Sequence, residues 1–127
     1  MSLIGATNEE KIWNYLYSKL GNAYGVAGIM GNINAESGLK PNNLQNSYEK
    51  KLNMTDDQYT AAVDNGSYTN FVYDSAGYGL VQWTYWSLKR DFLAYVQSKG
   101  ASIGDLEIQL EFLCKQLSES YTSSVWN

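Results

Sequence analysis

The sequence predicts a mostly α-helical fold with a small irregular or β-hairpin lobe. Apolar residues recur at helical spacing in several segments, and most of these segments open on a capping residue and close on glycine. Residues 67–82 have aromatic and β-branched residues between glycines, a pattern consistent with a small hairpin or irregular loop. The 127 residues include one proline and no linker or repeat, so we expect residues 1–127 to form one domain, cut from a longer chain.

The first helix is predicted over residues 8–20. Thr7 and Glu10 form a capping box, in which the hydroxyl and the carboxylate satisfy the first free amides of the helix. The apolar face consists of Ile12, Trp13, Leu16 and Leu20. Gly21 follows and ends the helix.

A second helix is predicted over residues 23–36. It contains three glycines that lie near one stripe: Gly25, Gly28 and Gly31. Each glycine costs about 1 kcal/mol relative to alanine in a helix interior. We therefore expect a central helix against which neighbouring elements pack closely, because residues without side chains permit such an approach.

The lobe is predicted between residues 39 and 83. Residues 39–53 are polar and asparagine-rich, with a short helical turn after Ser47. Thr55 and Gln58 form a second capping box, which opens a short helix that stops near Gly66.

Two stronger helices close the chain. The first is predicted over residues 85–99 and the second follows Ser102. One stripe of the second helix faces the core: Leu106, Leu110, Leu113 and Leu117. We also expect Trp13 and Phe92 in the core.

The composition excludes several classes of enzyme. The chain has no histidine and one cysteine, Cys114. It cannot build a Ser-His-Asp triad, a Cys-His peptidase site, a histidine-bound zinc site or a disulfide framework. Any chemistry falls to carboxylates, Tyr, Lys, Ser or Thr, or a carboxylate-bound metal, and we expect neither metal nor cofactor.

The charge and hydropathy of the chain limit the classes of partner that it could bind. A net charge of −4 without a basic stripe argues against nucleic acid. No run of about 18 apolar residues could span a bilayer, and the N-terminus lacks the regions of a signal peptide. The 11 Tyr and 4 Trp suit sugar rings and wet interfaces, as well as a large core.

Glu36 is the one oddly placed carboxylate. Most other acids lie at predicted helix starts, where the helix dipole stabilises negative charge. Glu36 lies near the C-terminus of the second helix, on the side that carries Ile29 and Ile33. Burial and the dipole would both favour the protonated acid, the form that can protonate a glycosidic oxygen. The structural alternative is a glutamate bonded to backbone amides at a helix end.

A second feature is the glycine strip over residues 77–83, GYGLVQW. Glycines on both sides of a tyrosine indicate close backbone approach, while the glutamine and tryptophan offer an amide and an aromatic plane. Such a strip suits a saccharide, although an ordinary glycine-rich turn has the same pattern.

Together, MGNINAESG at residues 30–38 and GYGLVQWT at residues 77–84 resemble the bacteriophage tail lysozyme domain. This family is related to goose-type lysozymes and soluble lytic transglycosylases, which carry a similar Glu-Ser motif on a central helix and a Gly-Leu-Met-Gln motif. The resemblance covers nearly the whole chain. It implies a lysozyme-like fold and a glycoside hydrolase that cleaves the β-1,4 bond between N-acetylmuramic acid and N-acetylglucosamine in peptidoglycan, with Glu36 as general acid.

The resemblance also implies contacts with the glycan, since residues 79–82 match the segment that lines the cleft in the relatives, with valine in place of methionine. The expected substrate-binding residues are Tyr78, Gly79, Leu80, Gln82, Trp83 and Tyr85. The expected partners are peptidoglycan glycan strands and other domains or subunits of a phage tail or cell-wall-penetrating assembly. The expected location is therefore the virion tail or the cell wall.

A second carboxylate would distinguish the possible reactions. Hydrolysis needs a base or a nucleophile besides the acid, whereas a transglycosylase can use one glutamate and the 6-hydroxyl of the substrate. Asp74 is the first candidate, with Asp64 and Glu49 behind it, but Asp74 also fits a cap of the turn through Ser75-Gly77. A muramidase, a lytic transglycosylase that forms 1,6-anhydro ends, and a non-catalytic peptidoglycan-binding domain all stay open.

Overall fold

The computed structural model describes residues 3–121, so the chain end at Trp126-Asn127 lies outside the described residues. Its helices are α1 (Asn8–Leu20), α2 (Ala23–Ser37), α3 (Asn46–Leu52), α4 (Asp56–Asn65), α5 (Trp86–Ser98) and α6 (Leu106–Tyr121). Within residues 3–121, β structure is limited to two isolated antiparallel bridges, Leu44–Tyr78 and Tyr78–Trp83. The mostly α prediction is confirmed, and residues 39–83, where the lobe was predicted, contain α3, α4 and irregular segments.

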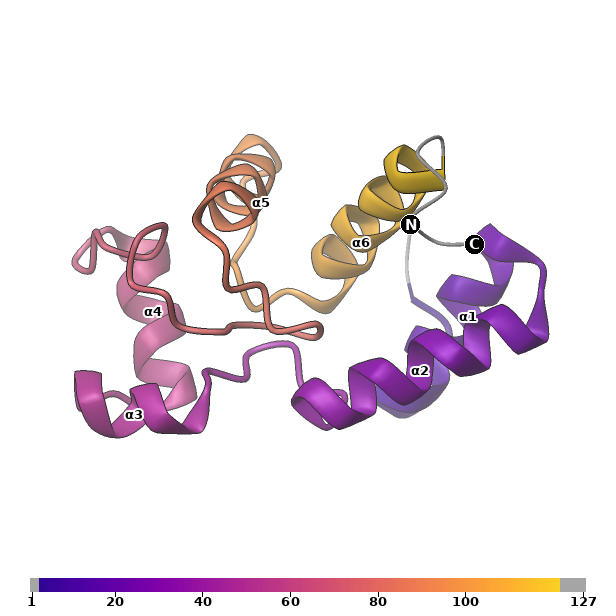
Figure 1. Cartoon of the computed structure of the whole chain (residues 1–127), viewed down its shortest axis with the longest axis horizontal. Helices are drawn as coiled ribbons and strands as arrows, with labels where there is room; N and C mark the ends of the chain where they lie inside the picture. The colour runs from indigo at the N-terminus through magenta and orange to yellow at the C-terminus, as the bar shows by residue number, and fades with distance from the viewer. Residues whose placement is uncertain (1–2, 122–127) are drawn as a thin grey trace.

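The helices form two groups with α5 between them. Figure 1 shows α1, α2 and α6 at one end of the molecule and α3 and α4 at the other. Helix α1 packs against α2 and α6, and α5 packs against α6. The segment between α4 and α5 crosses from one group to the other and lies beside the segment that follows α2. This meeting point is where the two sequence motifs come together.

Local capping sets the helix bounds. Both predicted capping boxes form, at Thr7 with Glu10 and at Thr55 with Gln58. Gly21 and Gly66 end α1 and α4 in the left-handed conformation, with φ of 64° and 83°. These bounds agree with the prediction because capping depends only on residues within a few positions of each other.

The glycines of α2 differ from the prediction. A Cβ placed on Gly28 or Gly31 would meet nothing within 4 Å among the described residues, and both positions are exposed. Helix α2 instead buries Val26 and Ile33. The glycine stripe therefore lies open rather than against a neighbouring element of the described chain.

The core is rich in aromatic rings. Trp83 stacks on Phe92 with ring centroids 4.7 Å apart, and Phe112 of α6 contacts both rings edge-on. Phe92 is fully buried as predicted, whereas Trp13 is only partly buried and stacks on Tyr17. The leucine stripe of α6 faces this core, with Leu110, Leu113 and Leu117 buried. No helix within residues 3–121 is long and apolar enough to cross a membrane.

Candidate functional site

An open pocket of about 570 Å³ lies where the end of α2 meets the glycine strip. Its lining consists of Glu36, Asn43, Gln45, Asn46, Ser47, Gln82 and Thr84. One carboxylate therefore stands among neutral amides and hydroxyls. Such groups donate and accept hydrogen bonds without charge, which suits the hydroxyl and acetamido groups of a saccharide.

Glu36 occupies the last turn of α2, just before the left-handed Gly38 that ends the helix. Its side chain is exposed, and no described residue forms a hydrogen bond or ion pair with it. The expected burial beside Ile29 and Ile33 is therefore absent: Ile33 enters the core while Glu36 points into the open pocket. The alternative of a glutamate bonded to backbone amides is not seen either. Both carboxylate oxygens are free to meet a ligand.

Gln82 forms the opposite wall through a tight turn. Backbone bonds join Tyr78 and Trp83 in both directions, at 3.1 Å and 2.9 Å, and Gln82 takes a left-handed φ of 53° between them. Its Nε2 donates to the carbonyl oxygens of Asn43 and Gly79 at 2.9 Å and 3.0 Å. The glutamine thus joins the glycine strip to the segment that follows α2.

Gly77 is required by the crowding of polar groups around it. A Cβ at this position would lie 2.8 Å from Gln82 Oε1 and 3.2 Å from both Gln45 Oε1 and Thr84 Oγ1. The Gly77 amide donates to Gln45 Oε1 at 3.0 Å, and the Gly77 carbonyl accepts from the Gln45 amide at 2.8 Å. The close backbone approach predicted here therefore lies beneath three pocket side chains.

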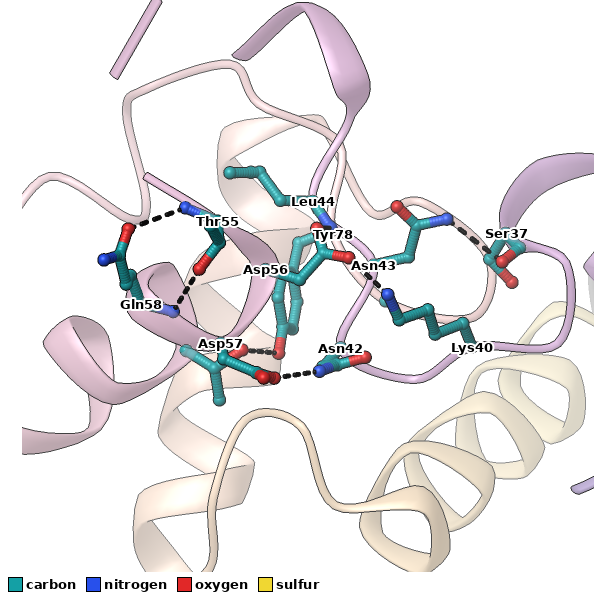
Figure 2. A network of polar contacts seen from close by, with 12 residues as sticks. Ser37, Lys40, Asn42, Asn43, Leu44, Thr55, Asp56, Asp57, Gln58 and Tyr78 are labelled. Carbon is teal, nitrogen blue, oxygen red and sulfur yellow. Dashed lines mark hydrogen bonds and ion pairs between the residues drawn. The ribbon is translucent and has the colours of Figure 1, made fainter. Parts of the chain in front are cut away.

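The segment after α2 is anchored to the start of α4, as Figure 2 shows. Asp56 accepts from Lys40 Nζ at 2.6 Å and from the Leu44 amide at 2.9 Å, and Asn42 donates to Asp57 at 2.7 Å. Burial alone would raise the pKa of Asp56, but these two hydrogen bonds hold it below its ordinary value. The anchor fixes the backbone that carries the pocket residues from Asn43 onward.

Asn43 links the same segment back to α2. Its Nδ2 donates to the Ser37 carbonyl at 3.0 Å (Figure 2), and its own backbone carbonyl accepts from the Gly79 amide at 3.0 Å. Through its side chain and its backbone, Asn43 therefore holds the residue next to Glu36 and the glycine strip in one arrangement.

Asp74 does not reach the pocket. Its buried carboxylate accepts from Lys89 Nζ at 2.6 Å, from the Tyr59 and Tyr68 hydroxyls at 2.6 Å and 2.8 Å, and from the Ala76 amide at 2.9 Å. The bond from the Ala76 amide is the turn cap that we gave as the alternative to a catalytic role for Asp74. Four donors already bond its oxygens, and the structure does not bring Asp74 together with Glu36 at the pocket.

The other two candidate carboxylates also lie outside the pocket lining. Asp64 accepts from the Ser102 hydroxyl and from the Ile103 amide, and so ties α4 to the loop before α6. Glu49 lies in α3, where a hydrogen bond with Asp56 raises the pKa of Glu49. Among the described residues that line the pocket, Glu36 is the only carboxylate.

Most of the expected substrate-binding residues lie in the core rather than at the pocket. Tyr78 and Leu80 are fully buried, and the Tyr78 hydroxyl lies 2.6 Å from that of Thr60. Trp83 is 3% exposed and donates from its indole to Gln116 at 2.9 Å. The tight turn directs these side chains inward and Gln82 outward, which the linear motif does not reveal.

The two other expected substrate-binding residues, Gly79 and Tyr85, also lie outside the pocket lining. Gly79 is buried with a left-handed φ of 88°, and a Cβ there would lie 2.9 Å from the Trp83 ring. Tyr85 is 63% exposed but lies outside the pocket lining, at the start of α5. The lining contains five further polar residues that we did not predict: Asn43, Gln45, Asn46, Ser47 and Thr84. In the sequence, the asparagine-rich run over residues 42–47 was the feature that could have indicated most of these pocket residues.

Comparisons with known proteins place the chain in a family. Neither curated proteins nor solved structures give a significant match. The phage tail lysozyme family matches residues 7–127, a range that includes both motifs and every residue of the pocket. Its description indicates a lysozyme-type action on peptidoglycan. The chain belongs to the phage tail lysozyme family.

Proposed function

We propose that this protein is a muramidase, which cleaves the β-1,4 bond between N-acetylmuramic acid and N-acetylglucosamine, and that Glu36 is its general acid. The observation that carries this proposal is the unpartnered carboxylate of Glu36 in a pocket otherwise lined by neutral amides and hydroxyls. Amides at Asn43, Gln45 and Gln82 in the same lining can form hydrogen bonds with sugar hydroxyls. We further propose that the protein acts at the cell wall as part of a phage tail or a similar assembly.

The reaction begins with proton transfer. A glycan in the pocket displaces water from Glu36, and this loss of solvation favours the neutral acid. The acid then gives its proton to the glycosidic oxygen as the bond to the anomeric carbon breaks, through a transition state with oxocarbenium character. The leaving sugar departs with a neutral hydroxyl, and water then bonds to the anomeric carbon and gives its proton to the Glu36 carboxylate, which regenerates the acid.

A second candidate is lytic transglycosylation by the same site. It is favoured by one observation: none of Asp74, Asp64 and Glu49 lines the pocket with Glu36. With a single carboxylate, Glu36 would accept the proton of the substrate's 6-hydroxyl as that oxygen attacks the anomeric carbon. The product would be a 1,6-anhydro end, and the acid would be regenerated.

The test is lysis of purified peptidoglycan by the wild type and by Glu36→Gln. We expect the variant to lose at least about 100-fold in rate, the usual contribution of a positioned general acid, with its helical circular dichroism unchanged. Glu9→Gln is the matched control, because Glu9 is also an exposed glutamate on a helix but lies outside this pocket. Full activity of Glu36→Gln would overturn the proposal.

Mass spectrometry of the released fragments separates the two reactions, since reducing ends indicate hydrolysis and 1,6-anhydro ends indicate transglycosylation. Wild-type protein that binds the wall but releases no sugar, under conditions where a control muramidase works, would instead identify a non-catalytic binding domain.

A further inference from the structure

Three large aromatic side chains lie exposed beside one another outside the pocket. Tyr73 is 68% exposed, Tyr85 63% and Trp86 40%. The rings of Tyr73 and Trp86 stack with centroids 5.8 Å apart and an interplanar angle of 23°, and the Tyr85 and Trp86 centroids are 6.3 Å apart. We call Tyr73, Tyr85 and Trp86 the aromatic platform. Exposed rings in contact with one another form a patch of a kind that marks binding surfaces.

The aromatic platform begins one residue after the pocket lining. Thr84 lines the pocket, and Tyr85 is the next residue along the chain. Tyr85 caps α5 and Trp86 is its first residue, so both rings project from the start of a rigid element. A ligand that extends beyond Thr84 along this chain segment meets these rings next.

The buried network holds the platform in place. Asp74, the neighbour of Tyr73, pairs with Lys89 at 2.6 Å, and the Lys89 amide donates to the Tyr85 carbonyl at 3.0 Å. The segment that carries Tyr73 is therefore fixed to the helix that carries Trp86. Rings that are positioned before binding lose little conformational freedom when a ligand stacks on them.

We propose that the aromatic platform binds further sugar rings of the same glycan strand whose scissile bond lies at Glu36. The inference rests on the proposed function, because a glycan is expected at the platform only if a glycan binds in the pocket. Sugar rings present apolar faces with hydroxyl groups at their edges, which match aromatic planes that end in phenolic hydroxyls. Charged side chains border the rings, with Arg90 over the Trp86 ring at 5.1 Å and bonded to Asp91, and such groups can form hydrogen bonds with sugar hydroxyls.

The test compares ligands of two lengths in the full chain carrying Glu36→Gln, which prevents turnover. Chitohexaose has six sugar rings and extends beyond the pocket, whereas chitobiose has only two. We expect Trp86→Ala and Tyr73→Ala to weaken the binding of chitohexaose by roughly tenfold, the upper range for loss of an aromatic contact. The affinity for chitobiose should change less than twofold, because the pocket is intact. Isothermal titration calorimetry measures both.

Tyr17→Ala is the matched control, because Tyr17 is also an exposed tyrosine that stacks on a tryptophan, Trp13, but on α1. It should leave both affinities unchanged, and Trp86→Tyr should retain most of the chitohexaose affinity. Unchanged chitohexaose binding by folded Trp86→Ala and Tyr73→Ala would overturn the proposal. A dimer of the wild type that dissociates in Trp86→Ala, with glycan binding intact, would also overturn it and assign the platform to self-association. Binding is measured without turnover, so an inactive enzyme with a working platform is distinguishable from an active enzyme without one.

Discussion

Two carboxylates in two regions of this molecule have opposite surroundings. Asp74 lies in the buried network behind the glycine strip, with a side chain that is 3% exposed and accepts four hydrogen bonds. Glu36 lies in the pocket in front of the strip, exposed and without a described partner. A saturated carboxylate maintains the structure, whereas an unsaturated one can exchange a proton with a ligand. The same acidic group therefore supports the fold in one region and is open to a ligand in the other.

The largest expected effect comes from removing the buried member of this pair. Asp74→Ala leaves Lys89 buried at 0% exposure without its counter-ion, so we expect the free energy of unfolding to fall by about 3–5 kcal/mol. Glu36→Gln should change it by less than about 0.5 kcal/mol, as surface substitutions usually do. Urea denaturation of both variants measures the contrast. Equal stabilities would show that the network is not a support of the fold.

Alkaline pH tests the network without mutation. Burial and hydrogen bonds to Asp74 raise the pKa of Tyr59, and burial raises the pKa of Tyr78 above the ordinary value of 10.0. These groups stay protonated in the folded protein, so their stabilising contribution is complete below pH 10 and falls as the pH rises further, by up to about 1.4 kcal/mol per unit for each. Phenolate absorbance followed with circular dichroism should show part of the 11 tyrosines ionising only as helicity is lost. Ionisation of all of them in a fully helical protein would contradict this.

The variant Gly77→Ala tests the pocket at Glu36 rather than the buried network at Asp74. The new methyl group must displace Gln82, Gln45 or Thr84, at a cost of about 1–3 kcal/mol, and the displaced groups are those that would bind glycan. We expect lysis of peptidoglycan to fall more than stability does. Activity and urea denaturation measured on one preparation provide the comparison, and a fully active variant would show that the pocket tolerates the rearrangement.

The smallest effect is expected at the open stripe of α2. Gly28→Ala places a methyl group where nothing described lies within 4 Å, so helix propensity alone decides the outcome. We expect the free energy of unfolding to rise by about 1 kcal/mol, with activity unchanged. A destabilised variant would mean that another element covers this stripe.

Features fixed by near neighbours in sequence were predictable. The capping boxes at Thr7 and Thr55 and the glycine stop at Gly21 appear as expected. Glu36 and Gln82 were both singled out, and the structure places them on one pocket. Their catalytic and binding roles stay predictions.

Features fixed by distant residues were not predictable. The fate of Asp74 depends on Lys89, which is fifteen positions away, and that of Trp83 on Gln116, which is thirty-three positions away. The inward direction of Tyr78 follows from the turn closed by Gln82 with positive φ, a conformation unusual for a residue other than glycine. An identical motif in an open loop would have exposed these rings.

The bonds that join the pocket walls have one more consequence. Gln82 to Asn43, Asn43 to Ser37 and Gly77 to Gln45 are all contacts between uncharged groups. Neutral amides neither titrate in the ordinary pH range nor weaken through ionic screening, which acts on charges. These three bonds should therefore be indifferent to salt and acidity, so a dependence of the pocket shape on either would arise at the charged anchor behind it, where Asp56 and Asp57 hold the segment after α2.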